Sequence, residues 1–188
     1  MPLDLLPGLS RVQLWQRSAI LPGDMISPSL AWTKVDCFTA YQRVSAEIQI
    51  RARLRETLND PEPLFHLRNV TSHSLLPGVQ AVEGVPEGLF AKAHLGAITT
   101  LEAEPPPPDD IANKTRRFVL FQGETFSVKG TAEFPAAADP HLHQEMLLKG
   151  RFFQLLEATL TVVGVEAASW TAPSLYVNRD LMLALYLG

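Results

Sequence analysis

The stretch Asp-Pro-His-Leu-His-Gln-Glu, residues 139–145, holds the side chains best suited to chemistry in this sequence. Two histidines one residue apart, flanked by carboxylates, could begin a metal site, because imidazole and carboxylate groups are common zinc ligands. The same residues also suit the start of a helix, since Asp139 can cap a free backbone N–H and Pro140 fits the first helical position. Gly150 stands where such a helix would end. The spacing therefore predicts a short helix over residues 141–149.

On this helix, His141 and Glu145 share one face at the i,i+4 spacing, whereas Leu142 and Met146 share another and His143 points elsewhere. His141 and Glu145 are therefore the candidate metal ligands. A structural zinc site needs four ligands and a catalytic one usually three, so one helix cannot complete either. We favour a solvated helix face that holds an ordinary side-chain pair, and we expect no cofactor.

Other patterns that would indicate catalysis are weak or missing. Cys37 is the only cysteine, which excludes an intramolecular disulfide and a cysteine-rich zinc site, and it has no cationic neighbour in sequence to activate its thiol. We interpret it as a small buried hydrophobic residue. The sequence contains no G-x-S-x-G, G-x-G-x-x-G or G-x-x-x-x-G-K-[ST] motif. No catalytic residue is predicted.

Arg51 and Arg53 occupy alternate positions in a segment with strand periodicity, so both would stand on one exposed face. They are candidate binding residues for a nucleic acid or an acidic partner. The net charge of −4 and the pI near 5.7 oppose a partner bound mainly through phosphates. Stacking aromatics are also missing from this segment. Charge on an edge strand that limits aggregation is the preferred interpretation, so nucleic acid is not the expected partner.

The clearest boundary in the chain is the segment EAEPPPPDDIAN, residues 102–113. Four consecutive prolines cannot continue a helix or donate to a sheet, and they favour an extended connector. We therefore divide the chain into an apolar, proline-containing N-terminal segment over residues 1–34, a repeat over residues 35–101, this linker, and a second repeat over residues 114–188. The N-terminal segment is expected to pack on the core.

Similar residues recur on the two sides of the linker, which indicates an internal repeat. The matches fall at offsets of 80, 88 and 86 positions, at Phe38 and Phe118, Leu54 and Leu142, and Leu89 and Leu175. Each copy has the pattern strand, turn, strand, short helix, strand, strand. The sequence thus predicts a mainly β (α+β) fold of two tandem β-rich repeats that form partial barrels or a sandwich.

The order of these features resembles a group of small, uncharacterised bacterial β-rich domains. An apolar hairpin is followed by a short helix of the form RLRETLND, an aromatic-led strand (PLFHL, RFFQL) and an aliphatic last strand. The resemblance covers both copies, from about Val35 to Leu187. It implies a β-rich fold and brings neither a function nor catalytic residues, because its motifs mostly record core positions.

The last predicted strand lies within residues 174–188 and is apolar on both faces. Met182 and Tyr186 lie on one side of it, opposite a row of leucines. A strand that is apolar on both faces must be covered on both, by the sister copy, the N-terminal segment or another chain. Met182, Tyr186 and Trp15 of the N-terminal segment are therefore the candidate interface residues.

These observations predict a non-catalytic binding or assembly module that associates with itself or with another protein. One alternative is a metal-dependent or small-molecule enzyme with a site between the repeats, formed from His66, His73 or His94 of the first and His141, His143 or Glu145 of the second. A second alternative is a nucleic-acid adaptor that uses the arginine face. The sequence has neither a run of about 18 apolar residues nor a typical secretory signal, so we expect a cytoplasmic protein without membrane contact.

Overall fold

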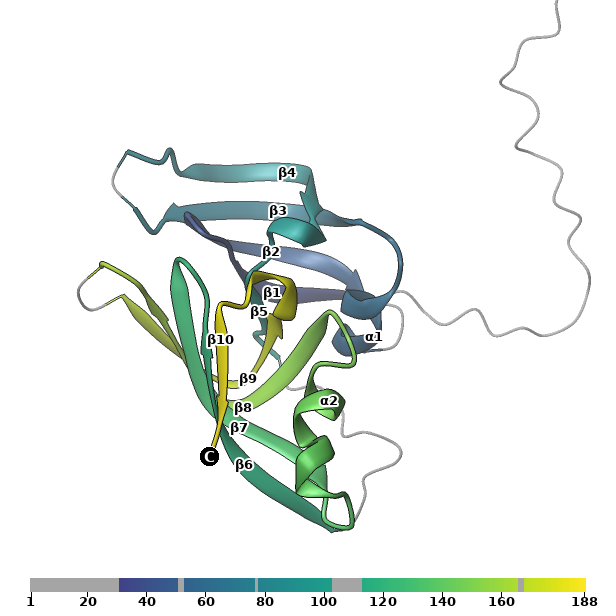
Figure 1. Ribbon diagram of the computed structural model, residues 1–188. Helices are drawn as coiled ribbons and strands as arrows, with labels where there is room; N and C mark the ends of the chain where they lie inside the picture. Colours follow the sequence, from purple (N-terminus) through teal and green to yellow (C-terminus); the bar gives the residue numbers. More distant parts are fainter. Residues whose placement is uncertain (1–30, 51–52, 77, 103–112, 166–167) are drawn as a thin grey trace, which may run out of the picture.

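The computed structural model describes residues 31–50, 53–76, 78–102, 113–165 and 168–188. The expected mainly β class is confirmed, because the described strands form one antiparallel sheet of ten strands (Figure 1). The sheet is open and does not close into a barrel. The predicted N-terminal segment up to residue 30, with Trp15, lies outside the described residues, and so do Arg51 and residues 103–112 of the linker.

The chain forms two halves with the same element order, and the first half lies above the second in Figure 1. The first half contains β1 (Ala31–Phe38), β2 (Gln42–Ile50), α1 (Leu54–Asn59), β3 (Leu64–Ser74), β4 (Val82–Ala91), the 3₁₀ turn η2 (Lys92–His94) and β5 (Ala97–Thr100). The second contains β6 (Lys114–Gln122), β7 (Phe126–Pro135), the 3₁₀ turn η3 (Pro140–Leu142), α2 (His143–Leu147), β8 (Phe152–Val162), β9 (Ser169–Asn178), the 3₁₀ turn η4 (Arg179–Leu181) and β10 (Ala184–Leu187).

The strand order across the sheet is β10-β6-β7-β8-β9-β5-β1-β2-β3-β4. The two halves are joined where β9 of the second half pairs with β5 of the first, with Ile98 opposite Tyr176. Within each half, the last strand pairs back onto the first, β5 onto β1 and β10 onto β6. Among the described strands, β4 and β10 are therefore the two edges of the sheet.

Equivalent main-chain hydrogen bonds hold the two halves. The turns after β1 and β6 are closed in the same way, and so are the entries into β5 and β10. In the turns, the Thr39 N–H donates to the Gln42 carbonyl and the Gly123 N–H donates to the Phe126 carbonyl, both at 2.9 Å. At the strand entries, the Gly96 N–H donates to the Phe38 carbonyl and the Leu183 N–H donates to the Gln122 carbonyl, both at 2.8 Å. The same turn and closure thus occur in each half.

A β-bulge recurs at matching places in both halves. The pairing of β2 with β3 shifts register after Ser45, and the pairing of β7 with β8 shifts after Lys129. Each bulge contains a residue with positive φ, Asn69 at 53° and Glu157 at 50°, which lie 88 positions apart. Because a bulge inserts one extra residue and increases the local twist, each bulge bends its half of the sheet at the same point.

The structure corrects two of the sequence matches. The pairing of β4 with β3 and of β9 with β8 makes Leu89 equivalent to Tyr176, an offset of 87 positions, and not to Leu175. The match between Phe38 and Phe118 is also wrong. The hydrogen bonds that close β5 and β10 make Phe38 equivalent to Gln122, an offset of 84 positions and not 80. Side chains alternate with a period of two along a strand, so a shift of four residues preserves the inward and outward pattern. The apolar alternation alone could therefore not reveal the error.

The single strand expected within residues 174–188 is also wrong, because the chain forms the end of β9, the turn η4 and then β10. Asn178 breaks the strand, since its side-chain oxygen accepts a hydrogen bond from the Asp180 N–H at 3.0 Å and caps the 3₁₀ turn. Each half therefore contains five strands where four were expected.

Two hydrophobic clusters form the core, and each takes residues from the other half. The first-half cluster includes Phe152 and Tyr176, and the second-half cluster includes Phe38. Asn59 at the end of α1 donates to the Phe152 carbonyl at 3.1 Å and accepts from the Phe152 N–H at 2.9 Å. This amide side chain pairs with the start of β8 as a strand would, and so ties the two halves together.

Candidate functional site

The predicted helix around the two histidines is present in a different form. Asp139 caps it as expected, accepting from the His141 N–H at 3.0 Å, but the chain makes a 3₁₀ turn before α2. His141 and Glu145 are exposed, whereas His143 is buried and its ring stacks on Phe134 with centroids 4.1 Å apart. The expectation that this segment is mainly a solvated face overlooked His143, because the 3₁₀ turn changes which side chain faces the sheet.

Metal binding by His141 and Glu145 stays a prediction. In the part of the chain that the structure describes, no three side chains of the types His, Cys, Asp and Glu come together as a metal site would require. Of the six residues proposed for a site between the repeats, His94 alone lines the pocket described below.

The two predicted binding arginines follow β2 in the sequence. That strand ends at Ile50, and Arg53 has an extended backbone and immediately precedes α1, in which Leu54 is buried. Arg51 lies outside the described residues, so partner binding by this pair stays a prediction.

Cys37 is fully buried in β1, as a small core residue would be. Burial raises the pKa of its thiol far above the ordinary value, and the negative charge of neighbouring Asp36 raises it further. Asp36 itself is held by Arg43 at 2.6 Å and by the Ser45 hydroxyl at 2.6 Å. The thiolate needed for nucleophilic chemistry is therefore disfavoured at this position.

Lys92 is a buried cation that the sequence did not single out. Its ammonium donates to the Thr57 carbonyl at 2.6 Å, pairs with the Asp60 carboxylate, and lies 4.8 Å from the centre of the Phe65 ring. In the second half Arg179 takes the equivalent place and donates to the Leu148 carbonyl. Both cations meet the carboxyl end of a short helix, where the helix dipole favours positive charge. Their role is structural.

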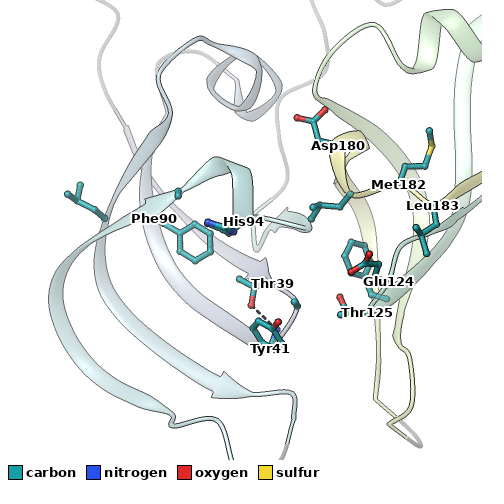
Figure 2. Close-up of a pocket in the computed structure, with 14 residues that line it drawn as sticks. Thr39, Tyr41, Phe90, His94, Glu124, Thr125, Asp180, Met182 and Leu183 are labelled. Atoms are coloured by element: carbon teal, nitrogen blue, oxygen red, sulfur yellow. Dashed lines mark hydrogen bonds between the residues drawn. The ribbon is translucent and has the colours of Figure 1, made fainter.

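A pocket of about 560 Å³ lies where the end of β4 faces the start of β10. Its walls come from both halves: the turns after β1 and β6, the end of β4 with η2, and the segment from η4 into β10. In Figure 2, Phe90 and His94 form one wall, and Leu183, Glu124 and Thr125 stand on the opposite one. The lining residues are Thr39, Ala40, Tyr41, Leu89, Phe90, Ala91, His94, Glu124, Thr125, Phe126, Asp180, Leu181, Met182 and Leu183.

The rim of the pocket is apolar and open to solvent. Tyr41, Leu89 and Leu183 are 57%, 64% and 66% exposed. Single exposed apolar residues are common on protein surfaces, but apolar residues that gather around a concave site mark binding surfaces. The Leu89 side chain is on the opposite face of β4 from Phe90, so Tyr41, Phe90 and Leu183 are the apolar side chains that border the hollow, and this pocket is the candidate functional site.

The polar groups of the pocket do not form a catalytic set. The Thr39 hydroxyl accepts from the Tyr41 N–H at 3.1 Å, which closes the turn after β1. Asp180 is bound by Arg151 at 2.9 Å and by Arg179 at 3.6 Å. Glu124 is exposed, and no ion pair involves it within the described ranges. The arrangement therefore offers apolar contact and negative charge.

Of the predicted interface residues, Met182 lines the pocket and is half-buried, and Tyr186 is 55% exposed on β10. Sequence reasoning missed Tyr41 and Leu89. Each lies near the end of a strand or in a turn, and no local pattern distinguishes such a residue from an ordinary surface side chain. The pocket arises from segments that meet only after the sheet forms.

Comparison with known proteins found no matching family model, no matching curated protein and no matching solved structure. Within the described ranges, no helix has the length and apolar character needed to cross a membrane. The function must therefore be argued from the pocket.

Proposed function

We propose that this protein is a non-catalytic binding module that holds an apolar ligand in the pocket between β4 and β10. The observation that carries the proposal is a hollow of about 560 Å³ with exposed Tyr41 and Leu183 at its rim. This volume lies in the range of about 300 to 1,000 Å³ that is typical of ligand sites, which are lined mainly by apolar side chains.

The energy available from this surface supports reversible binding. Complete burial of a leucine contributes about 1.5 to 3 kcal/mol, so covering Leu183, which is about two-thirds exposed, supplies about 1 to 2 kcal/mol. Contacts with Tyr41 and the deeper wall add to this gain, and the loss of translational freedom offsets part of it. We expect dissociation constants in the range of about 1 μM to 1 mM.

The test uses the neutral dye N-phenyl-1-naphthylamine, whose fluorescence rises in an apolar site. The full chain should bind the dye with saturation, and Leu183→Glu should weaken binding at least tenfold because it places a charge at the rim. Leu142→Glu is the matched control, since Leu142 is also an exposed leucine, at 48%, but lies in η3 outside the pocket. Equal dye binding by the wild type and both variants would exclude this pocket as the apolar site.

Self-association through β10 is the second candidate. Tyr186 is 55% exposed and Phe118 of the adjacent β6 is 51% exposed, so an apolar area continues across these two strands. Light scattering after size-exclusion chromatography would measure the mass of the wild type and of Tyr186→Lys. A dimer that dissociates in the variant supports assembly through β10. A monomer at about 1 mM chain would exclude it.

A further inference from the structure

The two edge strands of the sheet, β4 and β10, meet at the pocket without pairing, and we call this gap the seam. Its counterpart is the junction between the two halves, where β5 and β9 do pair. At the junction of the two halves, Ile98 of β5 pairs with Tyr176 of β9, and the Asn178 N–H donates to the Gly96 carbonyl at 2.9 Å. β10 occupies the same place in its half as β5 does in the first, because each pairs with the first strand of its half. Leu185 therefore stands where Ile98 stands.

β10 presents an open edge for such pairing. Its last bond to β6 runs from the Gly188 N–H to the Phe118 carbonyl at 2.9 Å. Main-chain groups alternate between the two edges of an antiparallel strand, so those of Leu185 and Leu187 face away from β6. Residues 181–188, LMLALYLG, contain neither a charge nor a proline that would oppose pairing with another strand.

β4 occupies the place of β9 but lacks the residues that close the junction. Leu175 is 2% exposed and Asn178 is fully buried, with its side chain donating to the Leu95 carbonyl at 2.9 Å. At the matching positions, 87 residues earlier, β4 has Gly88 and Ala91. A glycine contributes no side chain to pack and an alanine has no amide to donate, so the corresponding contacts with β10 do not form.

The exposure of equivalent residues shows what the seam leaves uncovered. Tyr176 is 4% exposed beneath the junction, whereas Leu89, at the matching place in β4, is 64% exposed. Thr99 of β5 is 8% exposed, whereas Tyr186 of β10 is 55% exposed. A strand paired with β10 would thus cover Tyr186, as β9 covers Thr99 in the first junction.

We infer that the seam takes an extended peptide segment of a partner protein, which pairs its main chain with β10 and places an apolar side chain in the pocket. This inference rests on the proposed function and names its ligand class. Strand addition of this kind gains affinity from main-chain hydrogen bonds and specificity from the pockets that alternate side chains enter. The expected segment has apolar residues where β9 has Leu175, Tyr176 and Val177.

Charge defines one end of the peptide. In the antiparallel register of the first junction, the residue that follows the equivalent of Asn178 lies beside the start of β10, where Glu124 and Asp180 line the pocket. Arg151 and Arg179 already bind Asp180, so Glu124 supplies the uncompensated negative charge. His94 and Tyr41 are the remaining titratable groups in the lining. A basic residue at this end of the peptide fits the site.

A second copy of this chain is a poorer occupant than a foreign strand. The strand that it could offer in the equivalent register is its own β4, and β4 carries the same Gly88 and Ala91 that leave the seam open. A segment with the side chains that β4 lacks therefore fits the seam better.

The test uses the full chain and the probe peptide acetyl-Ser-Leu-Tyr-Val-Asn-Lys-amide, which copies residues 174–178 and adds a lysine. Binding is measured by isothermal titration calorimetry. N-methylation of the peptide tyrosine removes the N–H that would face Leu185, and should weaken binding about tenfold. N-methylation of the peptide valine is the matched control, because that N–H points away from β10, and it should change binding less than threefold.

Two further variants test the charge. Replacing the terminal lysine of the peptide by glutamate should weaken binding about fivefold, as expected for an exposed ion pair. Glu124→Gln should weaken binding of the lysine peptide and remove most of this preference. Glu83→Gln is the control, because Glu83 is an exposed glutamate of β4 outside the pocket, and it should leave both affinities unchanged.

The outcomes separate the two proposals. Dye binding that depends on Leu183, without any binding of the peptide, would leave the apolar site standing and overturn the strand inference. Equal loss of affinity on methylation of the tyrosine and of the valine would also overturn it, because it would show that main-chain pairing with β10 is not involved. A chain that dimerises and loses the dimer on adding peptide supports the β10 edge as the pairing surface, whereas a dimer unaffected by saturating peptide contradicts it.

Discussion

Replacing Lys92 with methionine removes a buried positive charge while keeping a side chain of similar length. The Lys92 side chain is 1% exposed, and its ammonium lies between the Thr57 carbonyl and the Asp60 carboxylate at the end of α1. Methionine fills much of the same space but donates no hydrogen bond. The variant therefore leaves both oxygen acceptors without their partner and also removes the contact with the Phe65 ring.

The expected loss of stability follows from two opposing contributions. Removing one partner of a fully buried ion pair costs about 3 to 5 kcal/mol, because the other charge is left uncompensated. The Asp60 side chain is 27% exposed, so water replaces part of what the ammonium supplied. The free energy of unfolding should consequently fall by about 2 to 3 kcal/mol, allowing for this hydration and for the lysine desolvation that is no longer needed.

Urea unfolding followed by circular dichroism measures this change. With a slope of about 2 kcal/mol per M, the midpoint should fall by about 1 to 1.5 M. Arg179→Met is the matched control, because Arg179 occupies the equivalent place but is 42% exposed, and it should cost about 0.5 to 1 kcal/mol. Equal losses in the two variants, or a Lys92→Met protein as stable as the wild type, would refute the reasoning that burial makes this pair matter.

Three further predictions follow from the core. The Cys37 thiol should not react with Ellman's reagent at pH 8 in the folded protein and should react fully in 6 M guanidinium, because burial raises its pKa; rapid reaction of the folded chain would contradict this. Asn59→Ala should lower the free energy of unfolding by about 2 kcal/mol in urea, because the N–H and carbonyl of buried Phe152 both lose a partner; a loss below about 0.5 kcal/mol would show that the two halves do not depend on it. Burial acts to raise the pKa of Glu133, but hydrogen bonds from Lys114 and Arg116 outweigh it and lower the pKa overall. The Glu133 carboxylate therefore stabilises the fold above the ordinary pKa of a glutamate, and this contribution is lost as pH falls. Glu133→Gln should reduce the difference in the free energy of unfolding between pH 7 and pH 3. An unchanged difference would show that Glu133 does not stabilise the fold through its charge.

Local signals in the sequence predicted the class and several boundaries. The hairpin of β6 and β7 follows from two β-rich runs around a glycine-containing turn, and β8 starts at Phe152 as expected. Asp139 caps its helix because the capping interaction involves only the next few residues. Such features depend on neighbours in the chain, which is why a single sequence can reveal them.

The pocket could not be predicted from the same signals. Leu89 and Leu183 are far apart in the sequence and become neighbours of one hollow only through the strand order of the whole sheet. Lys92 was missed for a related reason, since its partner Asp60 lies 32 positions away and no spacing rule links them. Periodicity reports which face a side chain takes and says nothing about which distant strand will cover that face.

The open seam follows from the way in which two similar halves are joined. Each half has one strand that could pair with the other half, β4 or β9, and one edge strand that could receive it, β5 or β10. The junction between the halves uses β9 and β5. The remaining pair, β4 and β10, would close the sheet if β4 kept the side chains of β9. Gly88 and Ala91 stand in place of Leu175 and Asn178, so β4 lacks both the buried leucine of the first junction and the side-chain amide that donates to a main-chain carbonyl there. The same substitutions that prevent closure leave β10 able to receive another strand.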